Sequence, residues 1–261
     1  MLLSRILENK IREVRKRKRK VPLEALKSRI TDEAQANNFK ESISCRGKTN
    51  IIAEIKQFSP SAGTLVRDFN PGKLARIYEE HGASAISILI DHRFFGGDLK
   101  NIVEVRKVTS LPILAKEFII DEYQIYEARA LGADAVLLIA SILEREKLRS
   151  YLDLAQELDI SCLVEIHREE EWQKIKDLPA HIIGINNRDL QTFKVDLGVT
   201  FDLMQKIPSY KVVVSESGIK TEKDIETLKK SGVDAFLIGE SLLRSKNIGK
   251  KLKKLLGNDS H

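Results

Sequence analysis

The chain has 261 residues, of which 42% are hydrophobic and 31% charged, a composition typical of a soluble globular protein. No apolar run approaches the roughly 18 residues that span a bilayer, and charges interrupt the start, MLLSRILENK, where a signal peptide would need an apolar stretch. We therefore expect a cytoplasmic protein without a membrane segment. Cys45 and Cys162 form no C-x-x-C pair, which argues against a disulfide framework and a thiolate metal site.

Residues 10–20, KIREVRKRKRK, carry the excess positive charge. They contain eight basic residues and one acid, a local +7, which leaves −1 for the rest of a chain whose net charge is +6. Such a run is either a solvated, partly helical arm or a nucleic-acid-binding arm. No aromatic residue is interleaved with the charges and no binding motif follows them. We expect a solvated arm and no nucleic-acid partner.

Two helices are predicted ahead of the first strand, at about Leu3–Arg19 and Asp32–Ser42, within an N-terminal helical extension of residues 1–48. They could cover the bottom of the following domain or lie over its mouth. Amphipathic stretches such as PGKLARIYEEHG and DEYQIYEARALG alternate with eight apolar, β-branched segments. These predicted strands start near Asn50, Ser84, Leu111, Asp134, Ile160, His181, Lys211 and Asp234.

The regular spacing of these units predicts the fold class. Gly82, Gly132 and Gly232 stand at helix-to-strand joints and are separated by multiples of 50 residues, or two βα units each. Eight alternations in about 250 residues are typical of an α/β fold, the (β/α)8 TIM barrel, here as one structural domain over residues 49–257. An open, doubly wound sheet is the alternative, but no G-x-G-x-x-G follows the first strand.

Charged and polar residues end several of the predicted strands. In the first strand Ile52, Glu54 and Lys56 share one face, so two opposite charges would enter the core together, as a structural ion pair or as working groups. Later strands end on Lys116, Glu165, Asn186 with Arg188, and Ser217. Because the carboxyl ends of barrel strands meet at one mouth, we predict an active site there rather than an isolated ion pair.

The last two strands carry a separate signal. SESGIKTEKD and LIGESLLRS each place a glycine, Gly218 and Gly239, between a strand end and a helix start. These glycines either only permit tight turns or expose backbone N–H groups at the positive end of a helix dipole. Because the loops after strands 7 and 8 are the frequent phosphate site of this fold, we expect a substrate with a phosphate monoester.

Motifs in every βα unit resemble, in order, those of the indole-3-glycerol phosphate synthase family of tryptophan biosynthesis. They run from about Leu2 to Leu256 and include AEIKQFSPSAG, FFGGDL, GADAVLLIA, LVEIH, IGINNRDL, VSESGI and FLIGESLLR. The resemblance implies a carboxy-lyase that closes the indole ring of 1-(2-carboxyphenylamino)-1-deoxyribulose 5-phosphate with loss of CO2 and water. It also implies no metal, no organic cofactor, and a monomer able to associate with other enzymes of the pathway.

The resemblance assigns catalytic roles at the mouth. Lys116 matches the general acid that protonates the ribulose carbonyl, and Glu165 matches the general base of the dehydration. Glu54 and Lys56 match the pair that holds Lys116 and the substrate carboxylate, and Lys56 is an alternative acid for the loss of water. We expect burial or nearby cations such as Lys56 and Arg188 to pull the pKa of Lys116 towards neutrality.

The other matched residues contact the substrate. Asn186 and Arg188 match contacts to its hydroxyls and carboxylate, with Asn186 and Ser217 counted among the catalytic residues. The further substrate-binding residues are Ser59, Ser61, Glu216, and an apolar wall of Phe95, Phe118 and Leu137. The implied phosphate-binding residues are Ser59, Gly218, Gly239 and Glu240.

Three positions depart from the family pattern. Glu240 stands where a serine is frequent, so only its backbone N–H suits a phosphate. His167 stands where an asparagine can occur, and we interpret it as an orienting hydrogen-bond partner, although it titrates near neutrality and could shift Glu165. Ala62 stands where many members have a lysine, which weakens loop or phosphate contacts.

Three other classes of protein remain alternatives. A Schiff-base aldolase would use Lys116 or Lys56 as a nucleophile and would be trapped by borohydride. A sugar-phosphate isomerase or epimerase would not need the charged set on strands 1, 3, 5 and 6 together. A nucleic-acid-binding protein would depend on residues 1–20, whose deletion would abolish binding and leave catalysis largely intact.

Overall fold

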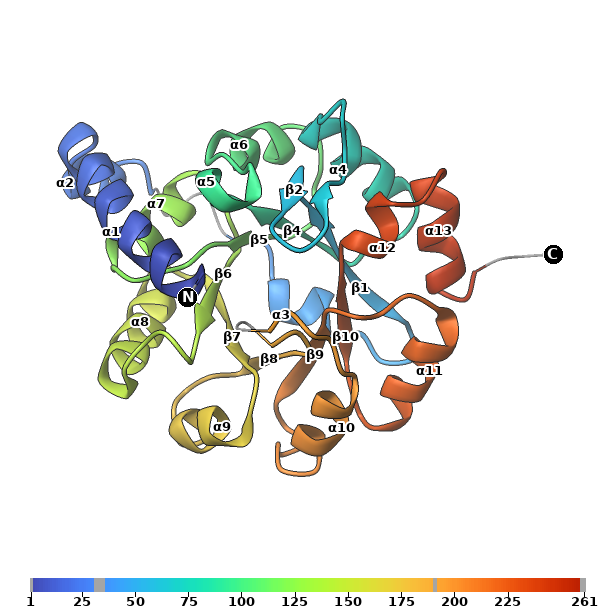
Figure 1. The fold of residues 1–261 in the computed structure, drawn as a ribbon. Helices are drawn as coiled ribbons and strands as arrows, with labels where there is room; N and C mark the ends of the chain where they lie inside the picture. The colour runs from blue at the N-terminus through green and yellow to red at the C-terminus, as the bar shows by residue number, and fades with distance from the viewer. Residues whose placement is uncertain (1, 31–35, 190–191, 259–261) are drawn as a thin grey trace.

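The computed structural model describes residues 2–30, 36–189 and 192–258. Eight parallel strands close into a barrel in the order β1-β10-β9-β8-β7-β6-β5-β4 (Figure 1). They are β1 (Asn50–Ile55), β4 (Ala85–Leu89), β5 (Ile113–Lys116), β6 (Ala135–Ile139), β7 (Ser161–Ile166), β8 (Ile182–Asn186), β9 (Val212–Glu216) and β10 (Ala235–Ile238). Each strand starts within two residues of its predicted position, and the predicted TIM barrel is confirmed.

Helices surround the barrel on the outside (Figure 1). They are α4 (Pro71–Glu80), α5 (His92–Phe95), α6 (Lys100–Arg106), α7 (Tyr123–Ala130), α8 (Arg145–Glu157), α9 (Glu169–Ile175), α10 (Gly198–Met204), α11 (Glu222–Lys230), α12 (Glu240–Leu243) and α13 (Ile248–Leu255). Local capping chemistry starts several of them: the Asn70 side chain accepts a hydrogen bond from the Lys73 N–H at the start of α4. Among the described helices, none combines the length and the hydrophobicity that a membrane crossing requires.

The alternation along each strand sorts the hydrophobic residues of the barrel strands into two clusters. Ile51 and Ile55 of β1 pack in the outer cluster, between the barrel and its helices, whereas Ile52 packs in the inner cluster. Because side chains two residues apart share a face, Glu54 points inward with Ile52. The predicted facing of this strand is confirmed.

The N-terminal extension contains α1 (Leu2–Lys20), α2 (Leu23–Lys27) and α3 (Phe39–Ser42). The first predicted helix is confirmed within one residue at each end, and α2 was not predicted. The second predicted helix is wrong at residues 36–38, which are not helical, and its residues 32–35 lie outside the described residues. The Asn37 N–H donates to Asp134, and the Asn38 side chain caps α3, so the helix begins only at Phe39.

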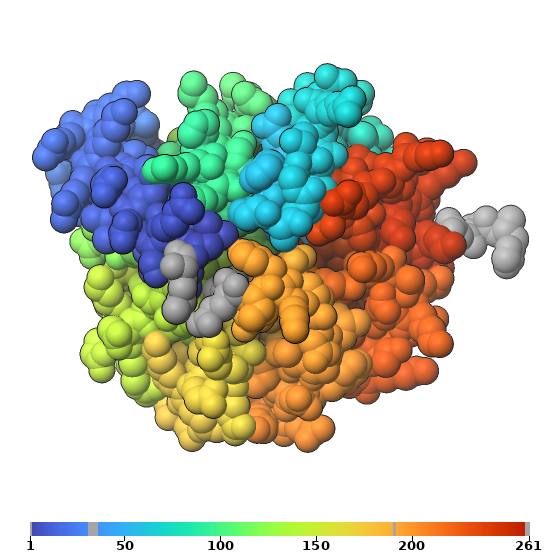
Figure 2. Space-filling view, in the orientation of Figure 1, coloured from blue at the N-terminus to red at the C-terminus, as the bar shows by residue number. Residues whose placement is uncertain are grey.

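The extension contacts both ends of the barrel. Phe39 and Ile43, at α3, are fully buried in the inner cluster with the residues that start the strands, such as Ala235, so α3 closes the bottom. Helix α1 lies at the mouth instead, where its Asn9 accepts a hydrogen bond from Arg93 of α5. Figure 2 shows the same arrangement: the dark blue residues of α1 lie beside the green residues of α5.

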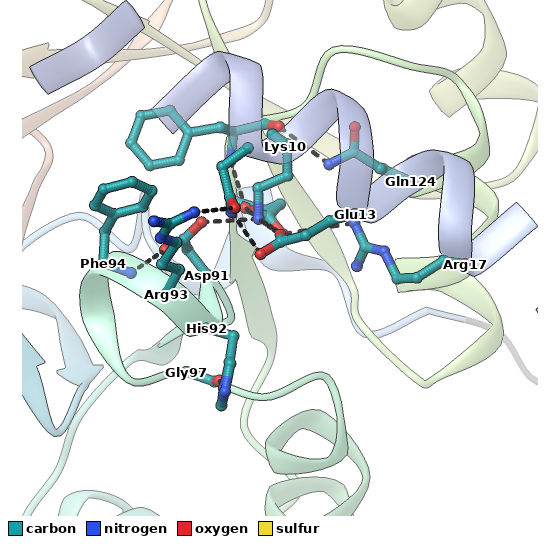
Figure 3. A network of polar contacts seen from close by, with 12 residues as sticks. Lys10, Glu13, Arg17, Asp91, His92, Arg93, Phe94, Gly97 and Gln124 are labelled. Atoms are coloured by element: carbon teal, nitrogen blue, oxygen red, sulfur yellow. Dashed lines mark hydrogen bonds and ion pairs between the residues drawn. The ribbon is translucent and has the colours of Figure 1, made fainter. Parts of the chain in front are cut away.

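A buried ion-pair network joins α1 to the mouth (Figure 3). The Lys10 ammonium lies 2.7 Å from Glu13, 2.8 Å from Asp91 after β4, and 2.9 Å from Glu117 after β5. Burial alone would lower the pKa of Lys10, but Glu117 and Asp91 outweigh it and raise this pKa. Since Lys10 is only 1% exposed, the expectation of a solvated arm is wrong at this residue.

Candidate active site

A cavity of about 770 Å³ opens at the carboxyl ends of the barrel strands. The hairpin of β2 (Phe58–Ser59) and β3 (Gly63–Thr64), cyan in Figure 2, stands at its rim. Its lining includes every predicted site residue except Glu216: Glu54, Lys56, Ser59, Ser61, Phe95, Lys116, Phe118, Leu137, Glu165, Asn186, Arg188, Ser217, Gly218, Gly239 and Glu240. Glu216 is fully buried and pairs with Lys116, so the fold brings the whole predicted set together.

Two lysines and three glutamates form a charged cluster at this cavity, with Glu216 buried behind its lining. The Lys56 ammonium pairs with the Glu54 carboxylate, and the Lys116 ammonium lies 3.4 Å from Glu54 and 2.7 Å from Glu216. Glu54, Glu216 and the third carboxylate, Glu165, are all buried. Glu54 and Glu216 therefore pair with the two ammonium groups, whereas Glu165 acts on Lys116 through its charge alone.

The pKa values in the cluster follow from burial and from these neighbours. Burial opposes the ionisation of Glu54, yet Lys56 and Lys116 lower its pKa to about 2. Burial raises the pKa of Glu216 to about 7, with Glu165 and Glu54 acting in the same direction against Lys116. For Lys116, burial alone would lower the pKa, but Glu216 and Glu54 outweigh it and raise it. The expected shift of Lys116 towards neutrality is therefore wrong, because carboxylates rather than cations surround this ammonium.

Two glycines leave room for the buried carboxylates. A Cβ on Gly184 of β8 would clash with the Glu216 side chain, and a Cβ on Gly239 after β10 would clash with the Glu54 side chain. Gly239 does not have a positive φ, so the contact with the neighbouring carboxylate is the reason that the structure gives for a glycine there.

One side of the cavity is apolar. The rings of Phe95, at the end of α5, and Phe118, after β5, lie with their centroids 6.1 Å apart at an angle of 34°. Leu137 of β6 belongs to the inner cluster beside them. An aromatic ring of a ligand could pack against these side chains, since offset and tilted contacts between rings are favourable.

The opposite side is polar. The Asn186 side chain accepts a hydrogen bond from the Arg188 N–H at 3.0 Å, and the Arg188 guanidinium donates to the Phe193 carbonyl at 3.2 Å. The Glu240 carboxylate lies 3.6 Å from the Arg188 guanidinium and accepts a hydrogen bond from Arg244 at 3.0 Å. Since the Glu240 side chain is turned to two arginines, its backbone N–H is the group that suits an anion.

The last two βα loops differ in what they offer an anion. Ser217 and Gly218 both have positive φ angles, 66° and 86°, a conformation that is strained at Ser217 and ordinary for a glycine. At the start of α11, a capping box of Thr221 and Asp224 satisfies the backbone N–H groups of these two residues. By contrast, α12 has no side-chain cap at Gly239, and the buried Ser241 hydroxyl has no hydrogen-bond partner among the described residues.

The structure adds lining residues that the sequence patterns did not select. Lys220, Arg244 and Lys251 add positive charge at the anion end, and the Lys251 ammonium donates to the Lys220 carbonyl at 2.7 Å. Lys220 directly follows the glycine loop in SGIK, which is a usable signal, whereas Lys251 comes from α13, far from any strand end. Within the described ranges, no group of three or more His, Cys, Asp or Glu side chains is arranged to hold a metal ion.

A family model described as indole-3-glycerol phosphate synthase matches residues 3–255. The chain is 46% identical over 255 residues to the indole-3-glycerol phosphate synthase of Alkaliphilus metalliredigens, covering 98% of each chain. It is 47% identical over 244 residues to that of Thermoanaerobacter sp. (strain X514), covering 94% of this chain and 93% of the relative.

Two solved structures share the fold. One is an N-acetylmannosamine-6-phosphate 2-epimerase from Clostridium perfringens, with a TM-score of 0.58 and 18% identity over 74% of this chain and 87% of that one. The other is from the tryptophan synthase complex of Pyrococcus furiosus, with a TM-score of 0.61 and 15% identity over 80% of this chain and 98% of that one. At these identities the likeness shows the fold alone.

Proposed function

Because the chain belongs to the indole-3-glycerol phosphate synthase family of tryptophan biosynthesis, we propose that the charged cluster at its barrel mouth carries out the ring closure of that carboxy-lyase. The observation that carries the proposal is the position of the Lys116 ammonium, held 2.7 Å from Glu216 and 3.4 Å from Glu54 in the cavity. A cation with its proton, fixed beside an apolar wall, suits protonation of a carbonyl on an aromatic substrate.

The cavity accommodates the three chemical parts of the substrate. The aromatic ring packs against Phe95, Phe118 and Leu137, and the ribulose hydroxyls face Asn186 and Arg188. The phosphate binds at the start of α12 and the Ser217–Gly218 turn, where donors come from the N–H groups of α12 and from the Ser241 hydroxyl, which has no hydrogen-bond partner in the part of the chain that the structure describes. Ser59 and Ser61 of the β2–β3 hairpin contact it from the rim.

Ring closure uses Lys116 as the acid. The aromatic carbon that bears the carboxylate attacks the ketone carbon, and the new bond leaves negative charge on the carbonyl oxygen. Lys116 donates its proton to that oxygen. The carboxylates of Glu216 and Glu54 raise the pKa of Lys116, so the ammonium form that serves as the acid is present throughout the neutral range.

Loss of CO2 follows from the same attack. The ring carbon that made the attack is no longer aromatic, and breaking its bond to the carboxylate returns the electron pair to the ring. Lys56 holds the substrate carboxylate until this step. The apolar wall then favours the neutral product CO2 over the charged carboxylate.

Dehydration completes the indole. The hydroxyl leaves with a proton from Lys56 or Lys116, and Glu165 removes a proton from the carbon attached to the amine nitrogen. Glu165 is buried at the end of β7 and lines the cavity, as a base for this proton requires.

We also propose the wider setting of the enzyme. Residues 1–48 form a helical extension to a single barrel domain of residues 49–257, and the packing of α3 in the inner cluster supports treating them as one unit. The enzyme works as a monomer in the cytoplasm, takes no cofactor, and is able to associate with other enzymes of its pathway.

The test is the growth of indole fluorescence after 1-(2-carboxyphenylamino)-1-deoxyribulose 5-phosphate is added to wild type, Lys116→Met and the exposed control Lys100→Met. We expect wild-type rates in the control and a loss of about 10²- to 10⁴-fold in Lys116→Met. Borohydride added with the substrate should leave no covalent adduct. Full activity in Lys116→Met would contradict the proposal, and an adduct on Lys116 or Lys56 would favour Schiff-base chemistry.

A further inference from the structure

His167, two residues after Glu165, lies between two carboxylates. Its backbone N–H donates to Glu171 Oε2 at 2.7 Å, and its ring Nδ1 lies 3.2 Å from the same oxygen. On the other side of the ring, Nε2 lies 3.3 Å from Glu165 Oε1. The His167 side chain is only 7% exposed, so both contacts are shielded from water.

These contacts fix the tautomer of the ring. An ionised carboxylate only accepts hydrogen bonds, so Nδ1 carries a proton towards Glu171. Glu171 is held in place by the His167 backbone N–H and by Arg168, whose Nε lies 3.6 Å from Glu171 Oε1. Nε2 is buried and makes no hydrogen bond to the described residues. A second proton on the ring would therefore sit on Nε2 and face Glu165 at ion-pair distance.

The charges around His167 favour that second proton. Glu165 from β7, Glu171 from α9 and Glu216 from β9 face the ring, and Arg168 is the positive group beside Glu171. Burial alone would lower the pKa of His167, but the hydrogen bond to Glu171 and the nearby carboxylates outweigh it and raise this pKa. The His167 ring therefore stays protonated as an imidazolium up to a higher pH than the ring of a free histidine.

We propose that His167 is a positioning residue that, anchored by Glu171, places a positive charge beside the Glu165 carboxylate and fixes one of its two oxygens. The other oxygen remains available to the substrate proton. His167 is not one of the described residues that line the cavity. The inference rests on the proposed role of Glu165 as the base. His167 is then the residue that orients this base among the neighbouring carboxylates.

The first test measures the coupling between His167 and Glu165 without turnover. In ¹⁵N-labelled enzyme, the His167 ring signals, assigned by their loss in His167→Asn, are followed from pH 5 to 9. We expect a proton on Nδ1 and a midpoint above that of free histidine, falling by roughly one pH unit in Glu165→Gln and in Glu171→Gln. The control Glu169→Gln, which removes an exposed carboxylate of α9 paired with Lys206, should leave the midpoint unchanged. An unchanged midpoint in Glu165→Gln would overturn the proposal.

The second test separates the two sides of the ring by turnover. His167→Asn retains a donor near Glu171 but loses the group that faces Glu165. We expect the acidic limb of its kcat profile to move up by roughly one pH unit, a tenfold loss below the limb, with KM unchanged and the rate recovered at high pH. His167→Gln, which places a neutral donor towards Glu165, should restore part of the rate.

The outcomes of the second test are distinct. A limb that stays in place in His167→Asn, or an equal loss at every pH, would overturn the positioning role. Full turnover in Glu165→Gln would instead remove the role of Glu165 as the base, whatever the His167 variants do.

Discussion

Carboxyl groups a few ångströms apart at the barrel mouth differ in charge state because their neighbours differ. Glu54 contacts both Lys56 and Lys116, and these cations overcome its burial and lower its pKa to about 2. Glu216 has Lys116 alone, and burial with two nearby carboxylates raises its pKa to about 7. A permanent anion beside a carboxyl group that titrates near neutrality is a combination suited to acid and base chemistry.

The raised pKa of Glu216 predicts how stability depends on pH. Because the folded value of about 7 lies above the ordinary 4.5, the stabilisation is complete below about pH 4.5 and is lost as the pH rises through 7. Glu216→Gln removes this loss, so its stability relative to wild type should improve by about 2 to 3 kcal/mol between pH 5 and 8.5. Urea unfolding at the two pH values measures the change, and a difference independent of pH would contradict the raised pKa.

A methyl group at Gly239 should disturb the charged cluster. The new Cβ would clash with Glu54 and push its carboxylate away from Lys56 and Lys116. We expect kcat to fall about 10- to 100-fold in Gly239→Ala, because small displacements of catalytic groups are costly. Gly72→Ala in α4 is the control, since its Cβ would meet only ordinary contacts. Equal activity in the two variants would count against the position of Glu54.

At the scale of elements, α1 is part of the mouth rather than a separate arm. Its Lys10 contacts the loops after β4 and β5, and Glu117 directly follows the proposed acid Lys116. Glu117 also accepts a hydrogen bond from the backbone N–H of Phe118 in the apolar wall. The ion pair therefore ties the N-terminal helix to the loop that carries both residues.

Lys10→Met should destabilise the fold strongly. It leaves the buried carboxylates of Asp91 and Glu117 without their ammonium partner, a change that typically costs about 3 to 5 kcal/mol. The control Lys16→Met removes an exposed charge of the same helix and should stay within about 0.5 kcal/mol of wild type. Urea unfolding monitors both variants, and similar stabilities would show that the network contributes little.

The strands could be predicted from the sequence because their signals are local. Short apolar runs between helix ends mark all eight, and the period of two places Ile52 and Glu54 inward together. The helix predicted at Asp32–Ser42 failed because a distant partner decides the conformation there: the Asn37 N–H donates to Asp134, 97 residues away. The spacing of apolar residues along the chain does not reveal such a long-range hydrogen bond.

In the candidate site, too, some features could be predicted from the sequence and others could not. Residues at strand ends could be found because barrel topology gathers them, and the family motifs named the rest. The direction in which the pKa of Lys116 shifts could not be predicted from the sequence, because it depends on Glu216, which is 100 residues away in sequence and 2.7 Å away in space. Lys10 and Lys251 lie on helices outside the strand-end pattern, so only packing brings them to the mouth.

At the scale of the whole molecule, the described surface shows few large apolar side chains. The exposed ones are Ile11, Phe58, Val195 and Tyr210, which come from separate elements. Association into a stable oligomer normally requires a contiguous apolar patch. We therefore expect sedimentation velocity to give a single species near the chain mass of 29.6 kDa across the micromolar range. A dimer that persists on dilution would contradict the proposed monomer.

In the proposed reaction, Lys116 acts in ring closure and Glu165 acts later, in dehydration. The most direct measurement is a single turnover of substrate labelled with ¹⁴C in its carboxylate, in which released ¹⁴CO2 is counted and the indole product is quantified by its fluorescence. Wild type should give one equivalent of each, Lys116→Met neither, and Glu165→Gln one equivalent of CO2 without indole. Release of CO2 by Lys116→Met, or its absence in Glu165→Gln, would contradict the assignment of the two steps.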